Sequence, residues 1–331
     1  MTTMTSTRTS SAVTGRGLRL TGLNWLVWRQ HRATFWTLIA GTVVAAGWMV
    51  YQRMGMMDTL HALGWPHPKS ENWYTSVGKG AITMTGYALG FLPILIGVFV
   101  GAPLIAGDLE NGTAKLVTSQ SVSRMRWIIT KLGVTVLVVF LGTVVLSQMF
   151  GWWWSPMKDR PEFMSWAEGP AFDNTGPVLT ALTVFTLVGG IAIGMVLRRT
   201  LLSMVVTFGF AVAVQIAWSY FRLQLGNPIS LTTHAGVLNS SPPSVPSGAV
   251  ELDTWFTTAS GKLYGWATCA GGATEKAEQA CLDKQGIVGW RVDYLPASQM
   301  ASMQWFGASV LLALTAAVIA FIFVWGRKPV I

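Results

Sequence analysis

The strongest constraint on the fold is a set of six long apolar stretches that are almost free of charge. They cover residues 33–52, 83–106, 128–150, 178–197, 201–221 and 304–325, and each is 20 to 24 residues long. A helix of that length crosses roughly 30 Å of hydrocarbon at a rise of about 1.5 Å per residue. Core helices of soluble proteins seldom stay uncharged over such a length. The sequence therefore predicts an all-α membrane protein with six transmembrane helices.

Lys131 is the one charged residue inside these stretches. It lies one turn from the start of the third stretch, where we expect its long side chain to extend to the membrane surface. The stretches contain no acidic residue and no histidine. Proton-coupled carriers usually need such a group inside the membrane, so their absence disfavours that class.

The charges outside the spans predict the orientation. Only 11% of the 331 residues are charged, less than half of the usual share of about a quarter. With a cytoplasmic N-terminus, the inner segments hold thirteen basic and two acidic residues, and the outer segments hold ten and twelve. This asymmetry follows the positive-inside rule and places both termini in the cytoplasm. It also explains the net charge of +9 without a nucleic-acid partner.

Residues 1–32 are expected to form a cytoplasmic tail followed by an interfacial helix. Residues 1–17 are rich in Ser, Thr, Gly and Arg and lack the apolar core of a signal peptide. In residues 18–32 apolar side chains fall on one helical face and three arginines lie off it. This pattern favours a short amphipathic helix in the inner membrane interface. The alternative is a simple extension of the first span.

The segment of residues 222–303 is a predicted extracytoplasmic loop between helices 5 and 6, too long for a plain connector. Its many aromatic residues predict a small folded cap, which acts either as a lid that contacts substrate or as a structural plug. Both cysteines, Cys269 and Cys281, lie in it. An oxidising compartment favours a disulfide between them, the alternative being two unpaired thiols.

The sequence contains no recognisable motif for catalysis, nucleotide binding or metal binding. There is no phosphate-binding loop of the G-x-x-x-x-G-K-[ST] type, and the four histidines have no metal-ligand spacing. We therefore expect no catalytic residue, no metal site and no directly bound cofactor. Gln148 and Gln215 are the most polar residues of the spans and are candidates for lining a pathway.

Small residues predict how some spans pack. Glycine pairs at a spacing of four occur in the second and fourth spans: Gly86 with Gly90, Gly97 with Gly101, and Gly190 with Gly194. Such spacing lets two helices approach closely. Pro93 and Pro103 are expected to bend the second span, because each removes a backbone donor.

The inner loop of residues 107–127 carries the most informative pattern. It reads Gly107-Asp108-Leu109-Glu110-Asn111-Gly112-Thr113-Ala114-Lys115, followed by Ser121-Val122-Ser123-Arg124. Gly112 permits a tight turn just after Glu110. The rest is expected to form a short helix along the membrane that serves as a docking surface, and the alternative is a merely solvated loop.

This loop resembles the E-x-G-T … P/S-V-S-R … K signature between the second and third spans of ABC-2 type ABC transporter permeases. Six spans, cytoplasmic termini and a long outer segment before the last span are similar too. Tyr294-x-Pro296-Ala297-Ser298, which leads to Gln304, resembles the entry to the last span in actinobacterial members. Two positions depart from the family pattern. Ser121 stands where relatives often have proline, and Phe306-Gly307 stands where they often have an acid.

The resemblance implies the membrane-spanning permease of an ABC exporter in a bacterial inner membrane, with residues 33–221 forming helices 1–5 and residues 304–331 forming helix 6 and a short tail. It implies a separate ABC ATP-binding subunit, which holds ATP and Mg²⁺, and a second permease, a homodimer being favoured over a heterodimer. Five loop residues would couple the permease to that subunit without being catalytic: Glu110, Gly112, Thr113, Ser123 and Arg124. An amphipathic or hydrophobic substrate is expected. The alternatives are a non-transporting envelope sensor or scaffold of the same fold, and an ATP-independent secondary carrier.

Overall fold

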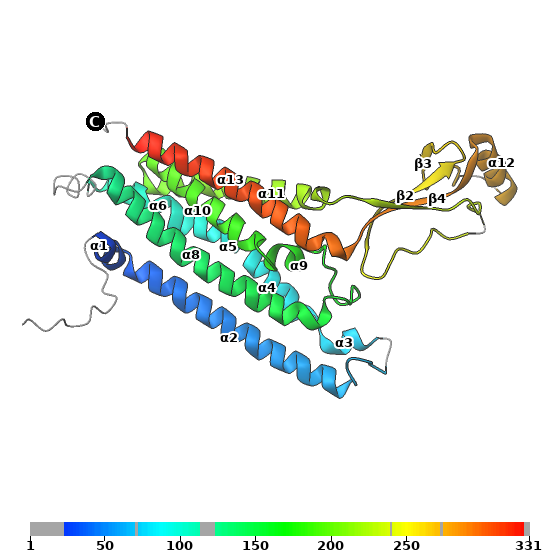
Figure 1. Ribbon diagram of the computed structural model, residues 1–331, viewed down its shortest axis with the longest axis horizontal. Coiled ribbons are helices and arrows are strands. Elements are labelled where there is room, and N and C mark those ends of the chain that lie inside the picture. Colours follow the sequence, from blue (N-terminus) through cyan, green and yellow to red (C-terminus); the bar gives the residue numbers. More distant parts are fainter. Residues whose placement is uncertain (1–22, 70–71, 113–122, 239, 272–273, 328–331) are drawn as a thin grey trace, which may run out of the picture.

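The computed structural model describes residues 23–69, 72–112, 123–238, 240–271 and 274–327. It is a bundle of long helices with a small sheet beyond one end (Figure 1). The main helices are α1 (Leu23–Gln30), α2 (Arg32–Ala62), α3 (Trp73–Val77), α4 (Gly80–Gly90), α5 (Leu92–Ile96), the π-helix η1 (Gly97–Gly101), α6 (Ala102–Glu110), α8 (Arg124–Trp154), α9 (Gly169–Asn174), α10 (Val178–Leu197), α11 (Thr200–Phe221), α12 (Glu275–Gln285) and α13 (Met300–Gly326). Three 3-10 turns, η2 (Ser155–Met157), η3 (Arg222–Leu225) and η4 (Ala297–Gln299), extend α8, extend α11 and precede α13.

Six helical segments in the described part of the chain are long and apolar enough to cross a membrane. They are Arg32–Ala62, Gly80–Glu110, Arg124–Met157, Val178–Leu197, Thr200–Leu225 and Ala297–Gly326. All six predicted stretches lie inside them, which confirms the number of spans. We name the end of the bundle that carries α1 and the last turn of α13 the inner end, after the predicted orientation, and the opposite end the outer end (Figure 1).

Several helices continue beyond their apolar stretches, because a helix that leaves the hydrocarbon can carry charge. In α2 the helix runs on through Arg53. The Arg53 guanidinium donates to the backbone oxygen of Trp152 at 2.8 Å and lies 4.1 Å from the centre of the Trp152 ring. Charged residues therefore mark the end of the apolar stretch but not the end of the helix.

The second span is broken, as its prolines predict. Pro93 lies at the start of α5 and Pro103 at the start of α6, and the π-helix η1 lies between them. The Thr186 hydroxyl of α10 donates to the Pro93 oxygen at 2.7 Å, so the neighbouring span satisfies backbone polarity at the break.

The fourth span, α10, occupies the centre of the bundle. Of its apolar window 94% is buried, against 11% for the first span and 17% for the fifth. A Cβ atom on Gly190 would lie 2.6 Å from the Gly97 oxygen, and one on Gly101 would lie 2.5 Å from the Leu187 oxygen. Backbone therefore meets backbone here, which confirms the prediction for these glycine pairs. Gly90 differs, since a Cβ there would meet nothing within 4 Å.

The N-terminal helix α1 is separate from the first span. A bend at His31 divides it from α2, and α1 packs against the inner end of α8. Val27 of α1 is buried, and the Trp28 ring stacks on Phe35 of α2 with 5.1 Å between centroids. The alternative of a simple extension of the first span is therefore wrong. Residues 18–22 of the predicted helix lie outside the described residues.

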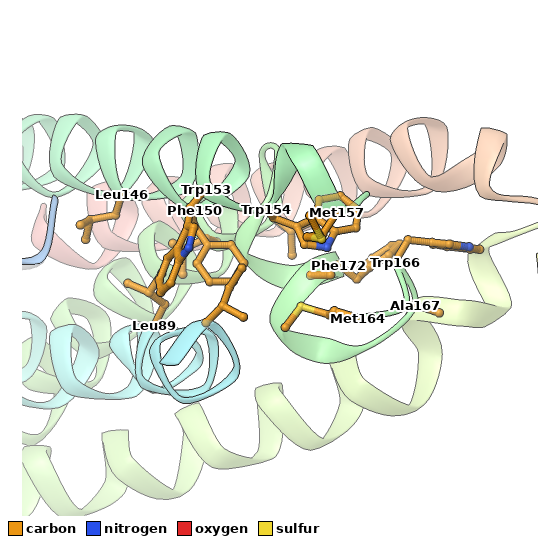
Figure 2. Close-up of a cluster of buried hydrophobic side chains, with 14 of the residues drawn as sticks. Leu89, Leu146, Phe150, Trp153, Trp154, Met157, Met164, Trp166, Ala167 and Phe172 are labelled. Carbon is orange, nitrogen blue, oxygen red and sulfur yellow. The ribbon is translucent and has the colours of Figure 1, made fainter. Parts of the chain in front are cut away.

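The segment between α8 and α10 folds back into the outer end of the bundle (Figure 2). Its side chains Met157, Met164, Trp166 and Phe172 join Phe150 and Trp153 of α8 in one buried apolar cluster. The short helix α9 follows and packs on α4 and α8. The connection between the third and fourth spans is therefore part of the core.

The prediction of an all-α protein is wrong for residues 222–303. Strands β1 (Ile229–Thr232), β2 (Val250–Thr258), β3 (Leu263–Gly265) and β4 (Ile287–Leu295) form an antiparallel sheet in the order β1-β4-β2-β3. Leu282 of α12 is buried with Phe256 and Ile287. We call residues 227–296 the arm, since Figure 1 shows its sheet and α12 extending beyond the helices.

Two contacts organise the arm. Cys269 and Cys281 form a disulfide, with 5.8 Å between their Cα atoms, which ties α12 to the chain that follows β3. At the base of the arm, Gln299 and Asn227 exchange two hydrogen bonds of 2.8 and 2.9 Å. The two chain segments that lead into and out of the arm are thus joined where they leave the bundle.

Candidate functional site

Three elements meet at the inner end: the end of α6, the start of α8 and the turn between α10 and α11. Glu110 is the last residue of α6. Its carboxylate accepts a hydrogen bond of 2.8 Å from the backbone N–H of Thr200, the first residue of α11. A carboxylate at a helix N-terminus satisfies a free donor and opposes the positive end of the helix dipole. Glu110 therefore joins the second span to the fifth.

The turn between α10 and α11 consists of exposed basic residues. Arg198 ends α10 in the left-handed conformation, with φ 58°, and its N–H donates to the Gly194 oxygen at 3.0 Å. Such a φ is uncommon for a residue other than glycine. Arg199 follows in an extended conformation. From the sequence, both arginines count only toward the positive charge of the inner side. The signal for a shared surface was that this three-residue loop lies on the same predicted side of the membrane as the coupling segment.

The remaining predicted coupling residues flank the turn at the end of α6 and the start of α8. Gly112 has φ +70°, the left-handed conformation that a tight turn after Glu110 requires. Ser123 is the N-cap of α8, and its hydroxyl accepts from the Arg126 N–H at 3.3 Å. Arg124 is half-buried, and its charge interacts unfavourably with that of Arg198. Thr113 and the rest of residues 113–122 lie outside the described residues.

A buried ion pair lies beneath this surface. Lys131 of α8 is fully buried, pairs with Asp108 of α6, and donates to the Leu104 oxygen at 3.3 Å. The prediction that Lys131 extends to the membrane surface is therefore wrong, because the structure supplies a counter-ion inside the bundle. The expected absence of acids from the spans is also wrong at this end, since the second span continues through Asp108.

The N-terminal helix is tied to the same ion pair. The Gln30 amide of α1 donates to the second carboxylate oxygen of Asp108 at 3.0 Å. The adjacent His31 is half-buried, and its Nε2 has no hydrogen-bond partner among the residues that the structure describes. Burial, assisted by the positive charge of Lys131, lowers the pKa of His31 from 6.5 to about 4, although Asp108 opposes the shift. His31 is therefore neutral at neutral pH.

The two glutamines predicted to line a pathway have different surroundings. Gln215 of α11 donates its amide to the Gly90 oxygen at 2.7 Å and so joins the fifth span to the second. Gln148 of α8 is exposed on the surface of the bundle. For Gln215 the contact is one that holds two spans together. Within the described ranges, no group of three His, Cys, Asp or Glu residues is placed to hold a metal ion.

One family model matches the chain. It is described as ABC-2 membrane transporter related, and it matches residues 39–222, from within α2 to the end of α11 and the first residue of η3. The matched region includes the ion pair and the turns at the inner end, and the arm lies beyond it. No curated protein and no solved structure matches the chain.

Proposed function

Because the chain belongs to the ABC-2 membrane transporter related family, we propose that this multi-pass cell-membrane subunit of a transporter is an exporter permease. It moves an amphipathic or hydrophobic molecule outward and is driven by ATP hydrolysis on a separate subunit. Both termini lie in the cytoplasm, and the arm lies on the outer side. A disulfide in the arm agrees with an oxidising outer compartment.

The observation that carries the proposal is the hydrogen bond between Glu110 and Thr200. Through this hydrogen bond between the end of α6 and the start of α11, a force on the inner loop reaches two spans. The inner loop connects α6 to α8, and the ion pair of Asp108 with Lys131 joins these two helices at the base of the loop. We infer that the loop moves the inner ends of three spans together when the ATP-binding subunit closes.

The docking surface of that subunit comprises the coupling residues and the arginine turn. Glu110, Gly112, Thr113, Ser123 and Arg124 contact it from the loop, and Arg198 and Arg199 contact it from the turn. Exposed guanidinium groups select an acidic surface on the partner. ATP and Mg²⁺ are held by the partner, and the permease residues transmit movement without taking part in the chemistry.

The substrate path is proposed to lie between two copies of the permease. The centre of one bundle is filled by α10, which neighbouring helices bury along its length. The second span instead presents a stripe of exposed apolar side chains: Met84, Tyr87, Phe91, Leu95 and Phe99. Such a surface suits a hydrophobic or amphipathic substrate rather than an ion. A homodimer is favoured over a heterodimer, and lipid covers the remaining exposed apolar faces.

A second candidate function is that of an envelope sensor or scaffold of the same fold. The observation that favours it is the arm, which extends beyond the helices and carries its own disulfide (Figure 1). An ATP-independent carrier is a weaker candidate, because the one buried acid of the second span described here, Asp108, is already paired with Lys131.

The test uses the full chain purified with the ATPase that co-purifies with it, reconstituted in liposomes. Glu110→Ala and Arg124→Ala should insert and bind the ATPase, but they should lose ATP-driven transport of amphipathic fluorescent dyes. Glu162→Ala removes an exposed acid near the outer end and serves as the matched control. Normal dye export by both inner-loop variants would overturn the coupling assignment. Absence of any ATPase from the purified protein would overturn the exporter.

A further inference from the structure

Four consecutive residues at the outer end each bind a different span. They are residues 173–176, at the end of α9 and just after it. Asp173 binds α11 and its extension η3, Asn174 binds α4, Thr175 binds α13, and Gly176 binds α8. No packing rule for apolar side chains requires so many polar contacts in one short segment. The number of polar contacts in so short a segment indicates that residues 173–176 set the relative positions of the outer ends of these four spans.

Asp173 makes the contact with the fifth span. One carboxylate oxygen accepts from the Trp218 indole N–H at 2.7 Å, and the other accepts from the Arg222 guanidinium at 2.9 Å. Burial raises the pKa of Asp173, whereas the charge of Arg222 lowers it. The far edge of the Trp218 ring rests on Gly307 of α13, where a Cβ atom would lie 2.5 Å from it.

The other three residues bind spans on the remaining sides. The Asn174 amide donates to the Gly86 oxygen of α4 at 2.8 Å. The buried Gln304 amide of α13 donates to the Thr175 oxygen at 2.7 Å, and the Ser147 hydroxyl of α8 donates to the Gly176 oxygen at 2.6 Å. All these acceptors are backbone oxygens, so the contacts fix the path of the chain itself.

The attachment to α4 differs in kind from the attachment to α11. Pro170 of α9 packs directly on Gly86 of α4, where a Cβ atom would lie 3.0 Å from the Pro170 Cα. Contact with α11 is made by side chains, namely Asp173 with its two partners and the Phe172 ring, whose centroid is 6.4 Å from that of Trp218. Helix α9 is therefore fixed on α4 by close backbone approach, whereas α11 is held to α9 through side chains alone.

Space for a movement of α11 exists beside this contact. An apolar cavity of about 450 Å³ lies among α10, α11 and α13, and Trp218, Phe221, Gly307 and Leu311 are among the residues that line it. The fifth span is also one of the least buried, with 17% of its apolar window covered. Besides Asp173, its outer end is held to α13 by the contact of Trp218 with Gly307 and, just after η3, by the hydrogen bonds of Asn227 with Gln299.

We propose that residues 173–176 form a latch that holds the outer end closed, and that Asp173 is the positioning residue whose release frees α11. The timing of this release within an export cycle rests on the proposed function, whereas the latch itself rests on the contacts above. In the closed state the latch joins α4, α8, α11 and α13. In the open state α9 stays on α4, while the outer end of α11 moves away from Asp173, which widens the partly open cavity and exposes Leu311 at its base.

The test measures access to the cavity in the full chain in membrane vesicles. Leu311 is buried and lines the cavity, and Leu311→Cys places a reporter thiol there. Cys269 and Cys281 are joined to each other, so the reporter is the thiol that reacts with a membrane-impermeant maleimide added from the outer side. Asp173→Asn should raise the labelling rate about tenfold, because the ion pair is lost. Asp159→Asn removes an exposed acid of the same segment and should leave the rate unchanged.

Two further variants separate release of the latch from misfolding. Arg222→Gln removes the other partner of the same ion pair and should raise the labelling rate as Asp173→Asn does. Exchange of the two charges, Asp173→Arg with Arg222→Asp, should bring the rate back toward that of the parent. If neither single variant labels faster than the parent, or if the exchange does not reverse the effect, the latch assignment is wrong.

A final measurement distinguishes failure of the latch proposal from failure of the export proposal. Vesicles that also contain the co-purifying ATPase are labelled with and without ATP and vanadate. Faster labelling of Asp173→Asn, with no effect of ATP on any variant, would support the latch and contradict the export cycle. An ATP effect on the parent, with no effect of Asp173→Asn, would contradict the latch and leave the export proposal in place.

Discussion

Lys131 and Asp108 form an ion pair across the inner loop, and the lysine side chain is fully buried. The two residues are 23 positions apart, one on each helix that flanks residues 111–123. Gln30 binds the same carboxylate, so α1, α6 and α8 converge on one acid. Three helices are therefore joined to one another at the base of the proposed coupling loop.

Removing one partner of this pair should destabilise the protein strongly. Lys131→Met leaves Asp108 buried beside α8 without its cation, and loss of one partner of a buried pair costs about 3–5 kcal/mol. The melting temperature in detergent should fall, and Asp108→Leu combined with Lys131→Met should recover part of the loss. Lys158→Met, at an exposed position, is the control. Equal melting temperatures for the parent and Lys131→Met would contradict a structural role of the pair.

The glycine contact between the second and fourth spans should tolerate no added methyl group. A Cβ atom on Gly190 would lie 2.6 Å from the Gly97 oxygen, so Gly190→Ala forces backbone apart and should cost about 1–3 kcal/mol. Gly209→Ala in α11, where nothing lies within 4 Å, should be neutral. Thermal unfolding of the two variants measures the difference. Similar melting curves would mean that the two helices separate at little cost.

Loss of the disulfide should loosen the arm and leave the bundle intact. Closing a loop over a sequence separation of 12 stabilises by about 3 kcal/mol in the chain-entropy model. Cys269→Ser with Cys281→Ser should speed amide hydrogen exchange in α12 and β4, while exchange in α10 stays unchanged. Faster exchange throughout the bundle would show that the arm and the helices unfold as one unit.

Acidification should destabilise the inner end through His31. Its pKa in the folded state is about 4, below the usual 6.5, so the unfolded chain binds the proton first as the pH falls. The stabilising contribution is present above pH 6.5 and is lost progressively as the pH falls toward 4. The melting temperature of the parent should decline over this range more steeply than that of His31→Gln. Parallel pH profiles would rule out this contribution.

The spans were predictable from sequence because a bilayer requires long uncharged helices, and α10 agrees with its predicted stretch at both ends. The glycine contacts and the break at Pro93 were predictable because each follows from one residue type and its spacing. The ion pair was not, since nothing in the spacing of Asp108 and Lys131 indicates that α6 continues far enough to bring them together. The latch was missed for a similar reason. Asn174 and Gly86 are 88 residues apart, and the pattern of a polar loop does not distinguish one that folds into the core.

The sheet of the arm was missed because its strands carry little local signal. Strand β1 has four residues and β3 has three, too few for a clear alternation of apolar and polar side chains. The two longer strands, β2 and β4, pair with each other although about thirty residues, including α12, separate them in the sequence. The aromatic content of the segment indicated folded structure there but not its type.

The central position of α10 has a consequence for the biosynthesis of the protein. Three spans leave the ribosome before α10 does, and two of them, the second and third, pack against it in the finished bundle. Until α10 enters the membrane, the glycine face of the second span has no helix to receive it and must be covered by lipid or by the insertion machinery. Assembly of this protein thus waits on its fourth span, and nascent chains that stop before residue 197 cannot reach the native arrangement.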